Sequence, residues 1–116
     1  MLKVLIADDE EKICQLIIKL INWEEMGLKI AATASNGIEA LEQAKICKPE
    51  ILITDIRMPG IDGMELIRKV KEKLPDTEII IISGYRHFEY AQTAIRYGVR
   101  NYLLKPIKKE ELWDTL

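Results

Sequence analysis

Five short apolar runs alternate along the chain with segments whose apolar residues recur at helical spacing. The runs cover residues 3–7, 28–33, 51–54, 78–82 and 101–104, and the helical patterns cover 13–21, 37–48, 63–74, 88–97 and 108–116. Strands that read as continuous apolar runs are buried on both faces. Strict alternation with helices then predicts an α/β domain in which helices cover a doubly wound parallel sheet on both sides.

Turn and capping signals mark the ends of the helices. Asn36 with Glu39, and Asp62 with Glu65, have the spacing of an N-cap residue and its partner three positions on. Gly98 is placed to end the fourth helix. The residues that we expect on buried helix faces include Ile13, Leu16, Ile17 and Leu20 in the first helix, Ile38, Leu41 and Cys47 in the second, Leu66, Val70 and Leu74 in the third, and Ala91, Ala94 and Ile95 in the fourth.

The residues that directly follow the predicted strands carry acidic, hydroxyl and ammonium side chains. Asp8 and Asp9 follow the first run, Asp55 the third, Ser83 the fourth and Lys105 the fifth. Two strand orders are common for five such units, and in either one the carboxyl ends of parallel strands lie on one edge, where open α/β folds bind ligands. Three carboxylates, a hydroxyl and an ammonium are therefore expected to converge there.

Three carboxylates that lie close together repel one another and need a positive charge to compensate. Two carboxylates 4 Å apart repel by roughly 4 kcal/mol at an effective dielectric near 20. Mg²⁺ is a hard cation that takes one or two carboxylates and keeps several waters, and Lys105 supplies further positive charge. Taken singly, each Asp has a structural explanation as a helix cap or turn residue; their joint occurrence at successive strand ends favours a magnesium site.

A site of this composition suits phosphoryl transfer. Mg²⁺ and an ammonium both stabilise the oxygens of a transferring phosphoryl group, and an Asp carboxylate is a known covalent acceptor. Asp55 follows the central strand and is the candidate acceptor, which leaves Asp8 and Asp9 to bind metal. The Ser83 hydroxyl is placed to donate a hydrogen bond to the new phosphoryl group.

Charge and composition narrow the classes of function. The 116 residues are 48% hydrophobic and carry a formal net charge of −2, which indicates one globular domain and argues against direct nucleic-acid binding by this chain. No apolar stretch is long enough to span a membrane, and no export signal is visible at the N-terminus. Two cysteines without a C-x-x-C motif and a single histidine exclude a thioredoxin-type pair and a Cys/His zinc site, and they fit a cytoplasmic location.

Four segments together resemble the receiver domain of two-component response regulators, over essentially the whole chain (1–116). They are Val4-Leu5-Ile6-Ala7-Asp8-Asp9-Glu10, Thr54-Asp55-Ile56-Arg57-Met58-Pro59-Gly60-Ile61-Asp62-Gly63, Ile82-Ser83-Gly84 and Tyr102-Leu103-Leu104-Lys105-Pro106. The resemblance implies a flavodoxin-like five-stranded sheet in the order 2-1-3-4-5 with five helices, as in the chemotaxis receiver that exemplifies this order.

The resemblance also implies roles for individual residues. Asp55 matches the phosphoacceptor; Asp9, Asp55 and the backbone carbonyl of Arg57 match the Mg²⁺ ligands, and Asp8 matches an acidic residue that holds the metal through water. Ser83 and Tyr102 match the switch hydroxyl and the switch aromatic residue. Lys105 matches the lysine that pairs with the phosphoryl group, and its bond to Pro106 is expected to be cis. Arg57 and Tyr85 occupy positions that vary in the family and tune dephosphorylation.

A narrower resemblance concerns the rest of the protein. The segments Ile21-Asn22-Trp23-Glu24-Glu25-Met26-Gly27, Ala34-Ser35-Asn36-Gly37 and Ser83-Gly84-Tyr85 through Phe88-Glu89-Tyr90-Ala91 are similar to receivers that precede an AraC-type helix-turn-helix domain. We therefore expect a sensor histidine kinase as phosphodonor, a DNA-binding output domain outside this chain, a last helix cut short at Leu116, and a possible homodimer through the face of the fourth helix, fifth strand and fifth helix. The receiver is expected to be a regulatory domain that catalyses only its own phosphorylation and dephosphorylation.

Three other functions remain open at this point. A flavodoxin has the same topology, but Asp8-Asp9-Glu10 would repel the phosphate of its flavin. A phosphatase of the haloacid dehalogenase type also uses an Asp nucleophile, although it needs an acid two residues later, where this chain has Arg57. A receiver-like module that works without phosphorylation usually lacks one of the key residues, and all of them are present here.

Overall fold

Strands and helices follow one another in the expected order. The computed structural model describes residues 1–84 and 88–116. The strands are β1 (Leu2–Ala7), β2 (Leu28–Ala34), β3 (Ile51–Thr54), β4 (Glu78–Ser83) and β5 (Asn101–Leu104). The helices are α1 (Glu11–Leu20), α2 (Gly37–Cys47), α3 (Gly63–Lys73), α4 (Phe88–Arg96) and α5 (Lys109–Thr115), with a 3-10 turn, η1 (Glu24–Met26), before β2. Each apolar run predicts the bounds of its strand to within one residue.

The strands form one parallel sheet in the order β2-β1-β3-β4-β5, which confirms the flavodoxin-like fold. Ala7 at the end of β1 pairs with Thr54 at the end of β3, and Ser83 at the end of β4 pairs with Leu104 at the end of β5. The register therefore brings the residues that follow these strands to the same edge of the sheet.

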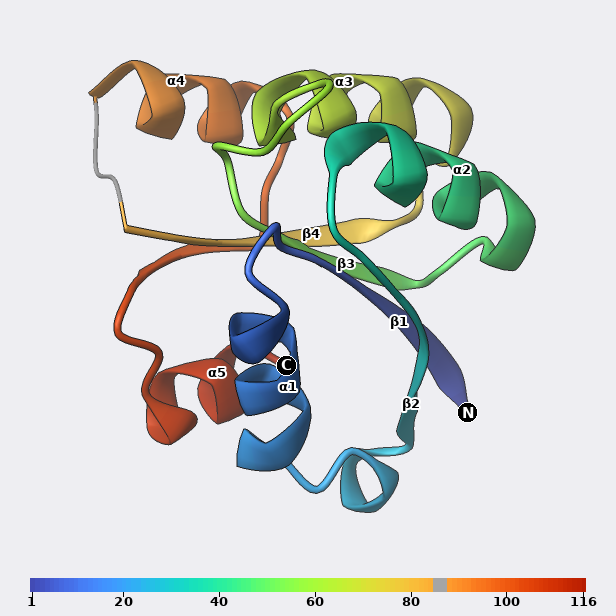
Figure 1. Cartoon of the computed structure of the whole chain (residues 1–116), viewed down its shortest axis with the longest axis vertical. Coiled ribbons are helices and arrows are strands. Elements are labelled where there is room, and N and C mark those ends of the chain that lie inside the picture. Colours follow the sequence, from blue (N-terminus) through green and yellow to red (C-terminus); the bar gives the residue numbers. More distant parts are fainter. Residues whose placement is uncertain (85–87) are drawn as a thin grey trace.

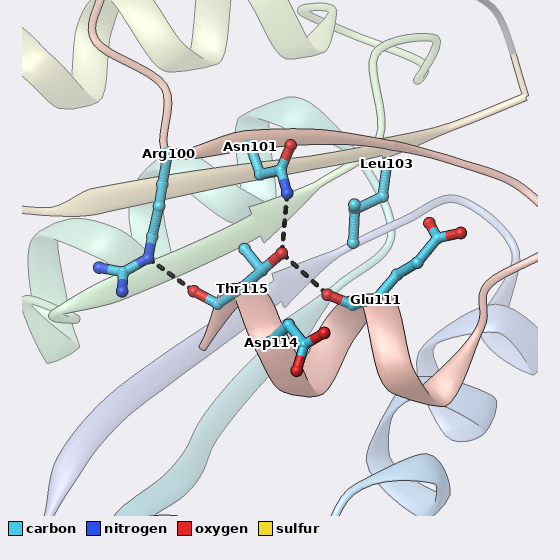
Figure 2. A pocket seen from close by; sticks show the side chains of 6 residues that line it. All are labelled: Arg100, Asn101, Leu103, Glu111, Asp114 and Thr115. Carbon is cyan, nitrogen blue, oxygen red and sulfur yellow. Dashed lines mark hydrogen bonds between the residues drawn. The ribbon is translucent and has the colours of Figure 1, made fainter.

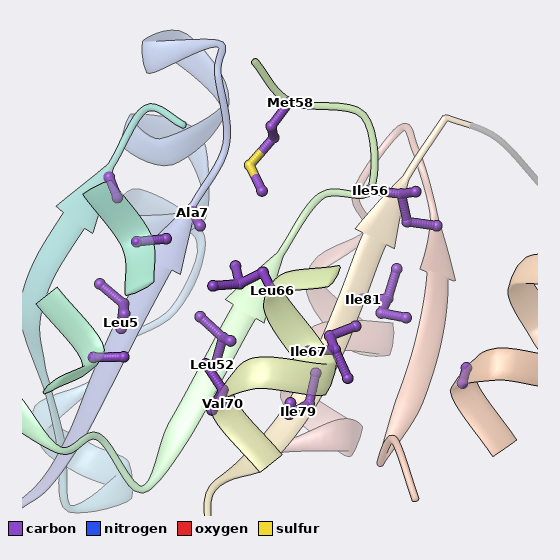
Figure 3. Packing of buried hydrophobic residues seen from close by; sticks show 14 residues of the cluster. Leu5, Ala7, Leu52, Ile56, Met58, Leu66, Ile67, Val70, Ile79 and Ile81 are labelled. Atoms are coloured by element: carbon purple, nitrogen blue, oxygen red, sulfur yellow. The ribbon is translucent and has the colours of Figure 1, made fainter. Parts of the chain in front are cut away.

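Helices cover both faces of the sheet (Figure 1). α2, α3 and α4 lie on one side, and α1 and α5 lie side by side on the other. Because successive side chains of a strand point to opposite faces, the apolar runs divide between two cores. Under α2, α3 and α4 are Leu5, Leu52, Ile79 and Ile81 with Leu66, Ile67 and Val70 (Figure 3), and under α1 and α5 are Val4, Ile6, Ile53, Ile80 and Ile82 with Cys14, Ile17 and Leu112.

The buried face of α2 differs from the expected one. Ala40 and Ala44 are fully buried, whereas Ile38 is 53% exposed; Leu41 and Cys47 are only half-buried. Two adjacent apolar stripes lie on this helix, about 100° apart, and the stripe of small side chains is the one that packs against the sheet and α3. The expectation for Ile38 was wrong because a pattern of apolar residues does not tell which stripe leaves room for close packing.

Helical spacing also predicts the wrong burial for one larger residue in each of α1 and α4. Cys14 and Ala94 are buried, whereas Leu16 is 41% exposed and Ile95 is 80% exposed. The expectation of a buried face is wrong for these two larger residues. The expectation for Tyr85 lies outside the described residues, as does the side chain of Phe88 in the segment of the narrower resemblance.

The predicted helix ends are confirmed. The side chain of Asn36 accepts a hydrogen bond from the backbone N–H of Glu39, and that of Asp62 accepts one from Glu65. At the end of α4, Gly98 adopts φ +66°, and the N–H of Val99 donates to the carbonyl of Ala94. This is a Schellman ending, in which a left-handed glycine closes the helix. None of the helices in the described ranges is long and apolar enough to cross a membrane.

Candidate functional site

Backbone hydrogen bonds tie the strand ends into one rim. The N–H of Asp8 donates to the carbonyl of Ala34 at 3.0 Å, and the N–H of Asp55 donates to that of Ala7 at 3.0 Å. The N–H of Lys105 donates to the carbonyl of Ser83 at 2.9 Å. These bonds extend the pairing of the strands to Asp8, Asp55 and Lys105, so the backbone of the sheet fixes the positions of all three residues.

The ammonium of Lys105 bridges two of the predicted carboxylates. Its Nζ lies 2.9 Å from Oδ2 of Asp55 and 3.0 Å from Oδ2 of Asp8. The side chain of Asp8 is 2% exposed, that of Asp55 8% and that of Lys105 17%. The structure therefore brings together, in a nearly buried contact, three residues that the sequence assigns to one site.

The second oxygen of each carboxylate accepts from the backbone. Oδ1 of Asp8 accepts the N–H of Glu10 at 2.9 Å, and Oδ1 of Asp55 accepts the N–H of Ile56 at 2.7 Å. Each carboxylate is held at both oxygens, so its orientation is set before any ligand arrives. Every carboxylate oxygen can accept two hydrogen bonds, which leaves capacity for a cation or a water on Asp8 and Asp55.

Burial and charge act in opposite directions on the pKa values at this rim. Burial raises the pKa of Asp8 above its ordinary value, although the hydrogen bond from Glu10 and the ammonium of Lys105 oppose that shift. Burial lowers the pKa of Lys105, but its hydrogen bonds to Asp55 and Asp8 outweigh this effect and raise the pKa overall. Lys105 stays charged, and the ionised form of Asp8 is less stable than it is in water.

A third acidic residue joins the pair that follows β1. Oxygens of Asp8, Asp9 and Glu10 lie within 4.8 Å of one another. Asp9 and Glu10 are exposed, whereas Asp8 is buried. The sequence prediction named Asp8 and Asp9 as metal ligands but gave Glu10 no role. A third acid directly after the pair was the signal that pointed to it.

A pocket of about 410 Å³ opens in front of these groups. It is lined by Asp9, Glu10, Asp55, Arg57, Gly84 and Lys105. Asp8 does not line this pocket and instead lines a separate hollow of about 300 Å³ beside Cys14 and Ser35. The pocket thus combines exposed acids at its mouth with an ammonium and a buried carboxylate, a combination that can hold a divalent cation and a phosphoryl group together.

The two predicted switch residues lie outside the pocket lining. Ser83 is fully buried at the end of β4, and its neighbour Gly84 lines the pocket. Tyr102 is half-buried and packs against the core under α2, α3 and α4. The expected cis bond between Lys105 and Pro106 is present. Sequence reasoning had placed Ser83 next to the phosphoryl group, and the structure places its backbone beside Lys105.

The donor set fits magnesium. Asp9, Glu10 and Asp55 offer carboxylate oxygens to the pocket, and an oxygen of Asp8 lies within 4.8 Å of those of Asp9 and Glu10. Hard oxygen donors are what Mg²⁺ takes. Arg57, whose carbonyl is the remaining predicted ligand, lines the same pocket. No soft sulfur ligand lines this pocket, so its chemistry differs from that of a zinc or copper site.

A larger hollow between β5 and α5 has a different character (Figure 2). It measures about 520 Å³ and is lined by Arg100, Asn101, Leu103, Glu111, Asp114 and Thr115. Within it, Arg100 Nε donates to the carbonyl of Thr115 at 2.6 Å, and Asn101 Nδ2 donates to Thr115 Oγ1 at 2.9 Å. These hydrogen bonds attach the end of α5 to β5, so the residues that line this hollow have a structural role.

Comparison with known proteins agrees with this geometry. A family model, the response regulator receiver domain, matches residues 4–116. The uncharacterized transcriptional regulatory protein YesN of Bacillus subtilis (strain 168) is 44% identical over 116 residues, which are 100% of this chain and 32% of that protein. The chain spans less than half the length of this and other curated relatives.

Solved structures of response regulators show the same fold. The REC domain of AraT, a response regulator from Geobacillus stearothermophilus, matches with a TM-score of 0.91 and 44% identity, over 97% of this chain and 88% of that chain. A DNA-binding response regulator of the LuxR family from Staphylococcus aureus matches with a TM-score of 0.84 and 28% identity, over 99% of this chain and 95% of that chain. The structural similarity therefore extends over nearly the whole chain.

Proposed function

Because this chain belongs to the response regulator receiver domain family, we propose that it is a phosphorylation-activated switch in which Asp55 accepts a phosphoryl group. The observation that supports this role is the contact of Asp55 with Lys105 in a pocket that also contains Asp9 and Arg57. The donor is a phosphohistidine of a sensor histidine kinase: the phosphorus–nitrogen bond breaks, a phosphorus–oxygen bond to Asp55 forms, and the imidazole leaves.

The metal ligands in this proposal are Asp9, Asp55 and the backbone carbonyl of Arg57, with Asp8 acting through a water. Bound Mg²⁺ would neutralise the carboxylates and polarise the phosphoryl oxygens. Asp55 is nearly buried and held at Oδ1 by the N–H of Ile56, so its Oδ2 is the oxygen positioned to react. Lys105 already donates to that oxygen and would transfer its hydrogen bond to the phosphoryl group.

Phosphorylation is proposed to move a two-state equilibrium that involves Ser83 and Tyr102. A phosphorylated residue carries about −1.5 to −2 charges near neutral pH, which would draw Lys105 and the Ser83 hydroxyl toward it. Moving an equilibrium from 1:99 to 99:1 takes about 5.5 kcal/mol of differential stabilisation. One contact is too weak for that, so the proposal requires the ammonium, the hydroxyl and the metal to act together.

The readout is proposed to be transcription control by a DNA-binding domain elsewhere in the full-length protein. A relative of much greater length is named a transcriptional regulatory protein, and the −2 net charge makes this domain itself a poor DNA ligand. The AraC type of that domain rests on the sequence segments around Trp23, Asn36 and Tyr90. The coding sequence after Leu116 decides between this type and another, such as the LuxR type of one structural relative.

Dimerisation through the face of α4, β5 and α5 is proposed as the step between phosphorylation and output. Ile95 on α4 and Trp113 on α5 are 80% and 40% exposed, and large apolar side chains on a surface favour association. Phosphorylated protein should sediment as a dimer, and Ile95→Glu should shift it toward the monomer. A monomer under all conditions would contradict this step.

The central test of the function is labelling by acetyl phosphate in the presence of Mg²⁺. Intact-mass spectrometry should show the mass of one added phosphoryl group in the wild type and none in Asp55→Asn. Asp76→Asn is the matched control, because it removes an exposed carboxylate from the turn before β4 and should leave labelling unchanged. Equal labelling of Asp55→Asn and wild type would refute the acceptor assignment.

A further inference from the structure

Two helices begin in the same way, and both starts touch one loop. α2 starts with Asn36-Gly37 and α3 with Asp62-Gly63, and in each pair the polar residue caps the helix and the glycine is buried. The loop between them in space is the one that joins β3 to α3, residues 55–62. It carries Asp55 at one end, and Arg57 follows two residues later.

The start of α2 lies directly on the far part of this loop. A Cβ added to Gly37 would lie 1.9 Å from the carbonyl oxygen of Ile61 and 2.8 Å from its carbonyl carbon. The N–H of Gly37 donates to the carbonyl of Pro59 at 3.3 Å. Because the nearest atom, the carbonyl oxygen of Ile61, belongs to the backbone of the loop, side-chain rotation alone would not make room for an alanine.

The start of α3 holds the near part of the loop. A Cβ on Gly63 would lie 2.1 Å from the carbonyl oxygen of Asp55 and 2.7 Å from Cα of Ile56, and the N–H of Gly63 donates to the carbonyl of Ile56 at 2.6 Å. Arg57 therefore sits between two fixed points of the loop. The two helix starts therefore restrain the backbone on both sides of Arg57.

The exposed side chain of Ile38 contacts the same loop at Gly60. Its Cδ1 and Cγ1 lie 3.0 and 3.1 Å from where a Cβ of Gly60 would be, and Gly60 has φ +83°. The exposed Ile38 side chain thus lies over a left-handed glycine at the tip of the loop. Met58 is buried at 9% exposure and Ile61 packs against the core, so the loop contacts both the core and the start of α2, while Arg57, Pro59 and Gly60 stay exposed.

We propose that the first turn of α2, Gly37 and Ile38, is a positioning element that sets the affinity and selectivity of the site for Mg²⁺. The inference rests on the proposed function, because it takes the Arg57 carbonyl as a ligand. Neither residue lines the pocket; both act by fixing the loop. Mg²⁺ demands near-ideal octahedral geometry with short bonds, whereas Ca²⁺ tolerates flexible geometry, so a displaced loop should weaken Mg²⁺ binding more than Ca²⁺ binding.

The test compares Gly37→Ala, Ile38→Ala and a control, Ala44→Gly. Ala44 lies on the same helix and is buried, but it is absent from the contacts of the loop described above. Dissociation constants for Mg²⁺ and Ca²⁺ are measured on the folded proteins from amide chemical shifts, and stability is measured by urea unfolding in EDTA. Mutation of residues that orient metal ligands without touching the metal typically lowers metal affinity by about 10-fold or more.

Gly37→Ala is expected to raise the Mg²⁺ dissociation constant about 10-fold, with a smaller rise for Ca²⁺, and Ile38→Ala to raise it about threefold. Ala44→Gly should lower stability and leave both constants unchanged. In metal-free protein, Gly37→Ala should shift the amides of residues 57–61. A purely structural role would lower stability without changing the Mg²⁺ to Ca²⁺ ratio.

Unchanged metal constants and unchanged amide shifts in a folded Gly37→Ala protein would overturn the inference. If Gly37→Ala does not fold, Ile38→Ala decides, and an Mg²⁺ constant within error of wild type overturns it. A wild type that binds no Mg²⁺ would overturn both this inference and the proposed function. A wild type that binds Mg²⁺ and variants that bind it equally well would overturn the inference alone.

Discussion

The ammonium of Lys105 donates to Oδ2 of Asp55 at 2.9 Å, although the two residues are 50 positions apart in the chain. The contact joins the ends of β3 and β5, which are separated in the sheet by β4. Lys105 also reaches Asp8. Any cation that enters the pocket therefore meets carboxylates that are already partly neutralised by a fixed positive charge.

Replacing this charge should strengthen metal binding. Lys105→Met keeps most of the length of the side chain and removes a charge that repels a cation, so we expect the Mg²⁺ dissociation constant to fall about fivefold, the size of a partly screened charge contact. Titration calorimetry measures this. Lys108→Met is the control, because Lys108 is 69% exposed and outside the pocket; an unchanged or weaker affinity of Lys105→Met would contradict the expectation.

The same variant should separate labelling from its consequence. Asp55 keeps its Oδ1 contact with Ile56 in Lys105→Met, so acetyl phosphate should still label it. Without the ammonium, the phosphoryl group lacks one of the contacts that drive the switch, and dimer formation on phosphorylation should be lost. Sedimentation of the labelled variant as a dimer would remove Lys105 from the switch.

Neutralising Asp8 should stabilise the metal-free protein. Burial makes the ionised carboxylate of Asp8 less favourable in the folded state, and Lys105 keeps its ion pair with Asp55 when Asp8 is replaced. Asp8→Asn is therefore expected to be more stable than the wild type in urea unfolding at pH 7 with EDTA. It should bind Mg²⁺ more weakly, so the order of stability should reverse at high Mg²⁺. A loss of stability in EDTA would show that the contact with Lys105 outweighs burial.

The advantage of Asp8→Asn should depend on pH with a defined sign. The pKa of Asp8 is raised in the folded state, so between the ordinary value and the raised value the folded protein binds more protons than the unfolded chain. Wild-type stability then increases as the pH falls through this window. The difference in unfolding free energy between Asp8→Asn and wild type should be constant near neutral pH and shrink toward pH about 4. A difference that grows on acidification would contradict the raised pKa.

Glu10 should contribute to the metal affinity that the first two acids provide. Its carboxylate lies within 4.8 Å of those of Asp8 and Asp9 and lines the pocket. Glu10→Gln should raise the Mg²⁺ dissociation constant about threefold to tenfold, because one exposed charge near a cation contributes on the order of 1 kcal/mol. Glu11→Gln is the matched control: Glu11 is also exposed but lines the hollow beside Cys14. If Glu10→Gln and Glu11→Gln changed the Mg²⁺ dissociation constant equally, Glu10 would act only through the net charge of the domain.

Thr115 should matter for stability through its hydroxyl. Oγ1 donates to the carbonyl of Glu111 and accepts from Asn101 (Figure 2), whereas Thr93 Oγ1 makes an exposed bond to the carbonyl of Glu89 in its own helix. Thr115→Val leaves the Asn101 amide without its acceptor and should cost about 1–2 kcal/mol. Thr93→Val should cost less than about 0.5 kcal/mol. Urea unfolding of both variants measures the difference; equal costs would show that the bond from Asn101 to the Thr115 hydroxyl adds nothing to the stability of α5.

Much of the site could be predicted because it lies where strands end. Each apolar run predicts its strand closely, and the residue after a buried strand is recognisable without any three-dimensional information. The candidates Asp8, Asp55 and Lys105 followed from this rule alone, and the structure brings all three into contact. The roles of acceptor, ligand and switch came from the family resemblance and stay predictions.

Other features depended on packing. The sequence offered two stripes on α2, and only the fit of Ala40 and Ala44 against the sheet and α3 decided which is buried. The contact of Gly37 with Ile61 joins segments that no local pattern relates. Apolar periodicity and strand ends are local properties of the sequence, so the sequence alone determined the fold and the candidate site residues. Contacts between residues far apart in the chain depend on close packing, which selects among helix faces of equal hydrophobicity. Only the tertiary structure decided those contacts.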